Sequence, residues 1–560
     1  MHQLLKSHAW PATEPPLLIA WYTLTIGVLL ALQLVGDRLS EPRTWRFAGG
    51  LAAVLLALGL YTGRTVYPGE AVEEAFFLAA AYFGVTVALA WYITLPFAQT
   101  WLKNGRAHFP YPDLFQFSWN NILTIQTAGV YTALFWGSLG LWAAMFKIIH
   151  IDFFAKLFTK AWFVYLVSGS VFGFALSICS SQKRLVANLR ATMLVVFRNL
   201  LPLPCFIALI FLAALPFTGL KPLWDTNHAT ILMLNLQLYV VIFLNAVYQD
   251  GREKPPYNPW VRRLVEAGVV ILPAYAALSV YALWLRVQQH GWSVSRVFAA
   301  LSVLIAALYV AGYSRTALRR ESPWMKGISP INVRVAAVVI ALAVLVNTPL
   351  LDPRLITVRS QVARLMSGAV SAEKFDYRYL RFSLGRPGRD ALVRLAKLEK
   401  HPQAETIRSR AAEILAQKNR WHDTTTAQTA EQLQKRLKVI PEGKTLDPDF
   451  LEFLIAQKTS YEAYLAAGTW VLAVDLNKDG KEEYALFKRN NRNLVFSRTA
   501  DGWKQTGRLV SEGFINQDSD FEKQLAGFRV LAPEWDLLLI GERRYHLFPG
   551  KADQPPQFIE

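Results

Sequence analysis

Apolar residues dominate positions 15–350, where they form about ten stretches separated by short polar loops. A run of about 20 apolar residues is typical of a helix that crosses a lipid bilayer. We predict spans at 15–35, 47–62, 75–98, 117–146, 161–180, 200–219, 228–248, 264–286, 295–314 and 333–350. The pattern therefore predicts a polytopic α-helical membrane bundle with about 10 transmembrane helices.

The pattern changes after position 351, where charged residues become frequent. Helical periodicity predicts helices at 354–368, 372–383 with Ser371 as N-cap, 389–399, 403–417, 428–438 and 448–466. Strand-like runs follow at 470–474, 484–487, 493–498, 503–509, 527–530, 537–540 and 544–547. Asp501-Gly502 is a hairpin signal between two of them.

These patterns predict a soluble α+β C-terminal region, in which a helical connector precedes a small antiparallel β domain. The predicted domains are a transmembrane helical domain at 1–350, a connector at 351–420 and the soluble α+β domain at 421–560.

Composition supports the membrane class and argues against nucleic-acid binding. The chain is 53% hydrophobic and 13% aromatic, which is unusual for a soluble enzyme of 560 residues. The net charge of +18 comes with no recognisable nucleic-acid-binding module. Many basic residues instead flank predicted spans, where they meet anionic lipid and set orientation.

Basic residues also predict how the chain is oriented. They are dense in alternate loops, such as those that hold Arg252 to Arg263 and Arg315 to Arg334, and sparse in the others. The positive-inside rule places the basic loops in the cytoplasm. In a bacterial inner membrane, this multi-pass topology would put both termini, and with them the C-terminal region, in the periplasm.

Ionisable residues are nearly absent from the interiors of the predicted spans, which argues against proton-coupled transport. Glu266 is expected to form a local ion pair with Arg262 or Arg263. Polar amides are present in two spans, at Asn120, Asn121 and Gln126, and at Asn235, Gln237 and Asn245. Such amides either bond across helices as structural glue or line a substrate path, and both readings stay open.

Catalytic motifs are missing from the sequence. Neither HExxH nor GxSxG occurs. Gly443-Lys444-Thr445 looks like the end of a phosphate-binding loop, but Lys438 stands where the first glycine is needed, so a turn after a helix is expected instead. Cys179 and Cys205 lie in apolar segments, which argues against structural disulfides.

One string in the tail, Asp475 to Glu483, has the spacing of a calcium loop. Its oxygens would come from the side chains of Asp475, Asn477, Asp479 and Glu483 and from the carbonyl of Lys481, and Gly480 would allow the sharp turn. An EF-hand would need Glu where Leu486 stands. The alternative is a plain hairpin turn at Asp479-Gly480 without Ca²⁺.

Several long strings make the chain resemble a family of bacterial polytopic membrane proteins, the domain of unknown function 4153. The strings are Leu141–Ile149, Leu215–Trp224, Asn245–Gly251, Ser360–Gly368 and Glu373–Phe382. The resemblance implies no reaction, ligand or catalytic residue. From the residues themselves, Glu373–Phe382 is expected to be an amphipathic connector helix that packs Phe375, Tyr379 and Phe382 inward.

Two functional hypotheses follow from the sequence. The first is a non-enzymatic envelope protein that is anchored by its bundle and binds a periplasmic protein, a cell-wall component or Ca²⁺ through its tail. The second is a transporter or lipid-handling protein, which the spans, the prolines and the amides favour. In both cases the lipid bilayer is a partner and nucleic acid is not.

Overall fold

The chain folds into two compact units, Met1–Arg420 and Trp421–Glu560, and each is described by itself. The computed structural model describes all residues except 1–9, 11–12, 66–71, 222–228, 250–256, 320–323, 418–428, 442, 458–460, 466–468, 489–492, 501, 510–524, 526, 531–537, 541–542 and 546–560.

Within the described residues, the first unit contains ten helical segments that are long and apolar enough to cross a membrane, as predicted. Eight are single helices: α2 (Pro15–Leu34), α3 (Pro42–Thr65), α4 (Val72–Asn104), α5 (Tyr111–Ile148), α7 (Ala161–Ser181), α11 (Ala229–Tyr248), α14 (Val294–Arg319) and α15 (Ile328–Leu345). The chain is therefore a multi-pass membrane protein.

The other two spans are broken near prolines. The sixth consists of α8 (Lys183–Leu200) and α9 (Pro202–Thr218), and the eighth consists of α12 (Pro259–Val270) and α13 (Leu272–His290). Proline sits within the first two positions of α9 and of α13, where its missing N–H costs no hydrogen bond. By contrast, Pro96 and Pro216 lie inside helices α4 and α9.

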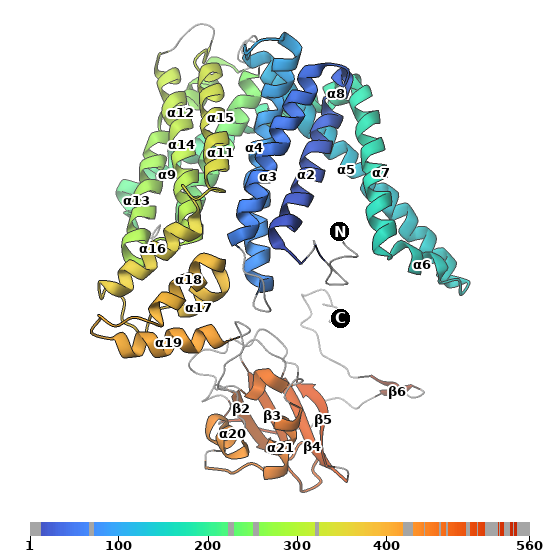
Figure 1. The fold of residues 1–560 in the computed structure, drawn as a ribbon, viewed down its shortest axis with the longest axis vertical. Coiled ribbons are helices and arrows are strands. Elements are labelled where there is room, and N and C mark those ends of the chain that lie inside the picture. The colour runs from blue at the N-terminus through green and yellow to red at the C-terminus, as the bar shows by residue number, and fades with distance from the viewer. Residues whose placement is uncertain are drawn as a thin grey trace. The chain divides into compact units, whose positions relative to one another are not determined.

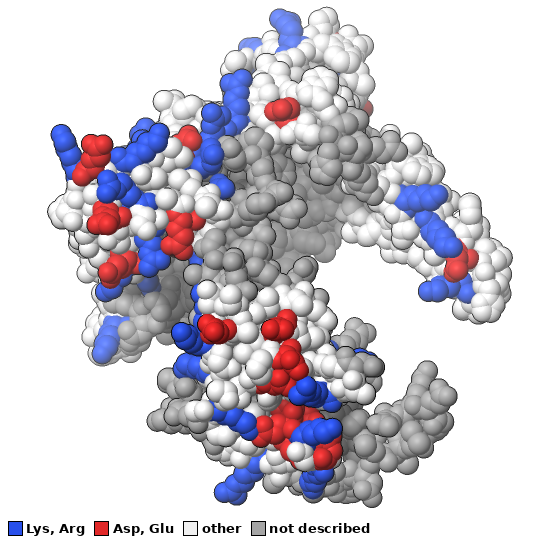
Figure 2. Space-filling view, turned by 60° about the horizontal axis from the view of Figure 1, so that its bottom comes forward, with Lys and Arg blue, Asp and Glu red and all other residues white. Residues whose placement is uncertain are grey.

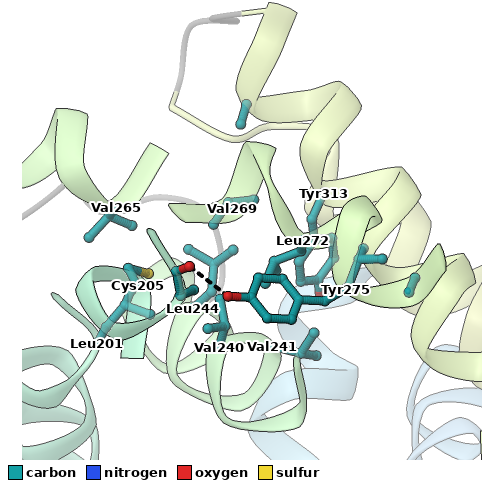
Figure 3. Close-up of a cluster of buried hydrophobic side chains, with 14 of the residues drawn as sticks. Leu201, Cys205, Val240, Val241, Leu244, Val265, Val269, Leu272, Tyr275 and Tyr313 are labelled. Atoms are coloured by element: carbon teal, nitrogen blue, oxygen red, sulfur yellow. Dashed lines mark hydrogen bonds between the residues drawn. The ribbon is translucent and has the colours of Figure 1, made fainter. Parts of the chain in front are cut away.

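The largest core cluster of the bundle joins helices α9, α11, α12, α13 and α14 (Figure 3). Tyr275 is completely buried there, and its hydroxyl donates to the carbonyl oxygen of Ala208 at 2.6 Å. This bond satisfies the one polar atom that the aromatic side chain brings into the core. Cys205, which packs in the same cluster, is a free thiol like Cys179.

Helices α5 and α7 form an arm that leans away from the other spans, with α6 (Phe153–Phe158) at its tip (Figure 1). With 38 residues, α5 is about 57 Å long at 1.5 Å per residue, nearly twice the thickness of a hydrocarbon core. Large apolar side chains along the arm, such as Leu134 and Leu141, are exposed on its surface. In a bilayer these side chains face lipid.

Within the described residues of the first unit, four helices follow the last span, namely α16 (Pro353–Met366), α17 (Tyr377–Ser383), α18 (Gly385–Leu395) and α19 (Ala404–Ala416). The expectation that Ser371 caps a helix was wrong. Asp376 caps α17 by accepting the N–H of Tyr379 at 2.8 Å, and the residues before it form turns. Phe375 and Phe382 are buried, as expected of an inward-packing connector, and Tyr379 is half-buried.

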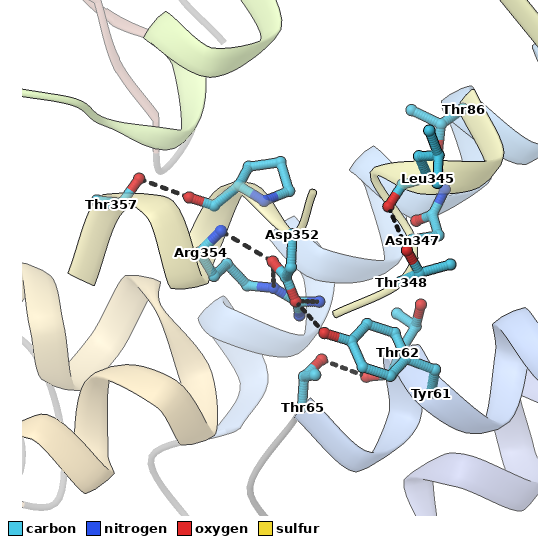
Figure 4. A network of polar contacts seen from close by, with 11 residues as sticks. Tyr61, Thr62, Thr65, Thr86, Leu345, Asn347, Thr348, Asp352, Arg354 and Thr357 are labelled. Atoms are coloured by element: carbon cyan, nitrogen blue, oxygen red, sulfur yellow. Dashed lines mark hydrogen bonds and ion pairs between the residues drawn. The ribbon is translucent and has the colours of Figure 1, made fainter. Parts of the chain in front are cut away.

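A buried ion pair marks the junction between the last span and the connector (Figure 4). The carboxylate of Asp352 binds the guanidinium of Arg354 at 3.0 Å and accepts the hydroxyl of Tyr61, on α3, at 2.9 Å. Asp352 also caps α16 through the N–H of Arg354. Each carboxylate oxygen therefore has a donor, which is the condition for burying a charge. Figure 2 shows acidic and basic side chains interspersed on the face of the protein that it presents.

The second unit contains a five-stranded sheet of order β1-β2-β3-β4-β5. Its strands are β1 (Lys438–Ile440), β2 (Thr469–Val474), β3 (Glu483–Lys488), β4 (Asn493–Thr499) and β5 (Gly502–Leu509). The last four pair antiparallel as predicted, although Asp501 of the predicted hairpin lies outside the described residues. Helices α20 (Ala430–Arg436) and α21 (Pro448–Ala456) contribute to the apolar core on this sheet.

Three details of the tail differ from the prediction. Residues 438–440 form strand β1, parallel to β2, where the end of a helix was expected, because the buried Ile440 extends the sheet edge. Phe528–Val530 form no strand. Among the residues that the structure describes, β6 (Leu538–Ile540) and β7 (Arg543–Tyr545) pair with each other as a separate two-stranded sheet.

Candidate intramembrane site

Four polar side chains from four different spans meet inside the bundle. They are Tyr111 on α5, Asn245 on α11, Tyr313 on α14 and Asn332 on α15, and we call them the polar tetrad. Asn332 Nδ2 donates to the hydroxyl of Tyr111 at 2.8 Å and to Oδ1 of Asn245 at 2.6 Å. Asn245 Nδ2 lies 2.8 Å from the hydroxyl of Tyr313, which in turn donates to Asn332.

Local packing brings two members of the polar tetrad together. Gly312 precedes Tyr313, and a Cβ added there would come within 2.9 Å of Ile331, the residue before Asn332. Helices α14 and α15 can therefore approach closely at this level because residue 312 has no side chain. Tyr313 is completely buried as a result, and its hydroxyl reaches the amides of Asn245 and Asn332.

A cavity of about 240 Å³ lies beside the polar tetrad and is lined by three of its members, Tyr111, Asn245 and Asn332. Aromatic side chains form much of the remaining wall. They are Tyr92, Phe97, Phe115, Trp119 and Tyr309. We call this the inner cavity, because it lies near the ends of α4, α11 and α14 that carry the basic loops. Apolar walls with a few convergent polar groups are characteristic of small-molecule sites.

A second cavity, of about 390 Å³, lies between α11 and α14 and shares Tyr309 with the first. Its polar lining comes from Asn235, Gln237 and Ser302, and we call it the outer cavity. Asn235 and Ser302 are exposed on the surface of the bundle, so this cavity opens towards lipid. Gln237 is completely buried, and its Oε1 has no hydrogen-bond partner.

The six amides predicted from the sequence separate in the structure. Asn245 belongs to the polar tetrad, whereas Asn235 and Gln237 line the outer cavity. Asn121 pairs with Gln99 of α4, and Asn120 accepts from Arg190 of α8 at 3.2 Å. Gln126 is exposed on the bundle surface and lies in neither cavity.

Sequence reasoning missed Tyr111, Tyr313 and Asn332. Tyr111 and Asn332 precede the predicted starts of their spans, at 117 and 333, so neither was considered as an intramembrane residue. Periodicity alone does not indicate which faces of four separate helices meet. The expected ion pair of Glu266 is present, since its carboxylate binds Arg262 at 2.8 Å and accepts from the indole of Trp324 at 2.8 Å.

The calcium-loop string joins β2 to β3 and is closed by its own hydrogen bonds. The carboxylate of Asp475 accepts the N–H groups of Asp479 and Gly480, and Glu483 accepts that of Leu476 at 2.7 Å. Gly480 has φ of +80°, which glycine adopts readily. Within the described residues, no group of three acidic, His or Cys side chains is arranged to hold a metal ion.

Asp479 itself accepts the N–H of Lys481 at 2.8 Å and the amide of Asn477 at 3.0 Å. These donors stabilise the ionised carboxylate and hold the pKa of Asp479 below its ordinary value. The hydrogen bonds that the ionised Asp479 accepts within the loop are therefore fully formed at pH values above the ordinary pKa range of a carboxylate. They are lost as the pH falls through the lowered pKa of Asp479. Binding of Ca²⁺ by Asp475, Asn477, Asp479, Lys481 and Glu483 stays a prediction.

Ten membrane-spanning segments and a polar tetrad beside a cavity define a polytopic membrane protein with an intramembrane pocket. Residues 5–395 match the family described as Domain of unknown function (DUF4153), and the chain belongs to that family. The match covers the bundle and most of the connector and ends before the β domain. No curated protein and no solved structure matches the chain.

Proposed function

We propose that this protein handles a small, uncharged, hydrogen-bonding molecule that enters its bundle from the lipid, and that it works as a transporter or lipid-handling protein of the bacterial inner membrane. The observation that carries the proposal is the inner cavity, where side chains of the polar tetrad face an otherwise aromatic wall. This evidence favours the second of the two sequence-based hypotheses. An anchor would not need such a pocket.

The lining of the two cavities indicates the charge of the ligand. All the residues that line them, in the part of the chain that is described, are uncharged. An ion brought into this environment would lose its hydration without gaining a counter-charge, which is costly. Amide and hydroxyl groups, however, both donate and accept hydrogen bonds, so they suit a neutral polar group.

Helical spacing supports a path between the two cavities. On α11, Gln237 and Asn245 are eight residues apart, so they lie about 80° apart around the helix and about 12 Å apart along its axis. On α14, Ser302, Tyr309 and Tyr313 follow each other at intervals of seven and four residues. Tyr309 lines both cavities, so we infer that its side chain would have to move for a ligand to pass from one to the other.

Filling the cavities tests this proposal without disturbing the polar tetrad. Ala336→Phe would occupy the inner cavity, and Ala306→Phe would occupy the outer one. The matched controls are Ala337→Phe and Ala311→Phe, because both alanines are exposed on the same two helices. Each variant is expressed in a deletion strain, and growth under envelope stress is compared with protein abundance in the membrane.

We expect the two cavity-filling variants to lose complementation at normal abundance, while the two controls complement fully. Complementation by Ala336→Phe and Ala306→Phe at wild-type level would contradict the proposal. If all four variants fell equally in abundance, overpacking alone would explain the loss. Thermal unfolding in detergent measures this directly, so a destabilised variant is recognised before its phenotype is interpreted.

The orientation is a separate part of the proposal. We infer from the distribution of basic loops that both termini, and the β domain with them, lie in the periplasm. Paired fusions at Glu560, to one reporter that is active only in the periplasm and one that is active only in the cytoplasm, test this. Activity of the cytoplasmic reporter would mean that the C-terminus lies in the cytoplasm. The predicted orientation, and the periplasmic location of the β domain, would then be wrong.

A binding function of the tail remains a second proposal, carried by the loop at Asp475–Glu483. A periplasmic location would expose this loop to the millimolar Ca²⁺ that weak extracellular sites need. Titration of the full-length protein with Ca²⁺ should raise its unfolding temperature, and Asp479→Asn should abolish the rise. Glu482→Gln is the control, since Glu482 pairs with Lys444 and is not among the predicted ligands. An equal rise in Asp479→Asn and wild type would exclude the site.

A further inference from the structure

The buried amide oxygen of Gln237, on α11, has no hydrogen-bond donor among the described residues. The residue is completely buried. Its Nε2, by contrast, donates to the carbonyl oxygen of Met233 at 3.0 Å and to the hydroxyl of Ser279, on α13, at 3.3 Å. An amide oxygen that is buried without a donor is costly, so a partner for it would stabilise the bundle.

The neighbours of Gln237 determine which end of its amide is left without a partner. Ser279 donates its own hydroxyl proton to the carbonyl oxygen of Tyr275 at 2.8 Å, so towards Gln237 it can only accept. The carbonyl oxygen of Met233 is an acceptor as well. Both neighbours therefore require the N–H groups of the amide, and rotating the amide by half a turn would break both bonds. The oxygen of Gln237 consequently needs a donor, and a second acceptor would not suit it.

The outer cavity is the place from which such a donor can come. It is lined by Gln237 and by three other polar side chains, which are those of Asn235, Ser302 and Tyr309. Amide and hydroxyl groups of this kind both donate and accept hydrogen bonds. In the described part of the chain, none of these three side chains has a hydrogen-bond partner. Polar groups from α11 and α14 thus meet in one cavity with hydrogen-bonding capacity that the protein itself does not use.

The position of the outer cavity favours an uncharged lipid as its occupant. Asn235 and Ser302 are exposed on the bundle surface, so the cavity opens towards the acyl chains of the bilayer, and the rest of its lining is aliphatic apart from Gln237 and Tyr309. Gln237 is about 12 Å from the start of the 20-residue helix α11, which is near the middle of a hydrocarbon core. A charged headgroup would be most costly at this depth.

Given the proposed function, on which this step rests, we propose that its ligand is a neutral lipid with a free hydroxyl group, such as a diacylglycerol. The hydroxyl donates to Oε1 of Gln237 in the outer cavity. The ester oxygens of the same lipid accept from the amide of Asn235 or from the hydroxyl of Ser302, and its acyl chains extend through the opening towards the bilayer. A lipid with ester and ether oxygens alone lacks the donor that Gln237 requires.

The test compares two lipids that differ in one hydrogen-bond donor. In native mass spectrometry, the purified full-length protein is titrated with dioleoylglycerol and with its methyl ether, which has the same acyl chains and oxygens but no hydroxyl proton. We expect the alcohol to bind about tenfold more tightly than the ether, which is the effect of one hydrogen bond to a buried acceptor. Dioleoyl phosphatidic acid has the same backbone with a charged phosphate and should bind more weakly than the alcohol.

Gln237→Leu should remove the preference for the alcohol over the ether, because the acceptor that distinguishes the two lipids is absent. The ratio of the two affinities is measured on the same protein, so a change in stability alone does not alter it. Tyr239→Phe is the matched control. It removes a hydroxyl from an exposed residue of α11 that does not line the outer cavity, and it should keep the wild-type ratio.

Equal binding of the alcohol and the ether by the wild type, or an unchanged ratio in Gln237→Leu, would overturn the proposal. Ala306→Phe, which fills the outer cavity, separates this result from a failure of the proposed function. If the two lipids bind equally and Ala306→Phe abolishes the binding of both, the cavity takes a lipid and only the preference for a hydroxyl is wrong. Tighter binding of phosphatidic acid than of the alcohol would contradict the proposed function as well, because its ligand is uncharged.

Discussion

Two clusters of amide side chains inside the same bundle have different surroundings. Asn121 and Gln99 exchange two hydrogen bonds, at 2.8 and 3.1 Å, are both buried, and line neither of the two cavities. The polar tetrad is equally well bonded, but three of its members, Tyr111, Asn245 and Asn332, also line the inner cavity. An amide in a membrane span can thus bond to a neighbouring helix within a packed region, or it can line a pocket. The residues around it determine which of these two positions it has.

The strongest effect on stability is expected from breaking the closed pair. Asn121→Leu leaves Gln99 its bond to the carbonyl oxygen of Leu34 but deprives its buried Oε1 of a donor, at a cost of about 1–3 kcal/mol. Replacing both residues by Leu should recover part of the loss, because the Oε1 of Gln99 is then absent and only the carbonyl oxygen of Leu34 loses a donor. Thermal unfolding in detergent and membrane abundance measure this. If the double variant were no more stable than Asn121→Leu, the two residues would contribute more than the hydrogen bonds between them.

A smaller loss of stability, with a larger loss of function, is expected from the polar tetrad. Asn332→Leu removes hydrogen bonds to Tyr111, Asn245 and Tyr313, but these three residues keep the bonds among themselves. Interhelical bonds of this kind contribute about 0.6 kcal/mol each on average in membranes. Complementation of a deletion strain should fail at nearly normal abundance. If abundance falls in proportion to complementation, the polar tetrad only holds helices together, as the pair of Asn121 and Gln99 does. The two clusters would then not differ in function.

Gln237 should respond more weakly than either cluster. Its amide nitrogen donates to Met233 at 3.0 Å and to Ser279 at 3.3 Å, but its oxygen has no partner. Gln237→Leu removes that unsatisfied oxygen along with the two bonds, so we expect a net change in unfolding free energy below about 1 kcal/mol. Reduced complementation with so small a change in unfolding free energy would indicate that Gln237 lies on the ligand path. Unchanged complementation would indicate that the ligand site is confined to the inner cavity.

The smallest effect is expected at Gln126, which lies on the exposed surface of α5. Gln126→Leu replaces a polar group by an apolar one where lipid is the neighbour, so abundance should stay constant or rise slightly. The variant serves as the reference for the other three. A clear loss of function here would indicate a partner on the surface of α5.

The sequence predicted the membrane architecture well, because length and hydropathy depend on residues that are neighbours in the chain. All ten spans and the four antiparallel strands β2–β5 were found in this way. The polar tetrad was not, apart from Asn245, because its members are up to 221 residues apart and meet only through helix packing. Strand β1 was missed for the same reason, since its partner Thr469–Val474 lies on the other side of a helix in sequence.

The central claim is that the polar tetrad borders a cavity that a small uncharged molecule can enter. It is tested most directly by cysteine labelling in a chain whose native Cys179 and Cys205 are replaced by Ala. Val333→Cys places a thiol in the inner cavity, and Leu123→Cys places one in the buried packing near Asn121. We predict that N-ethylmaleimide, which is small and uncharged, labels position 333 in native membranes much faster than position 123. Equal and slow labelling at both positions, with full labelling after denaturation, would contradict the account.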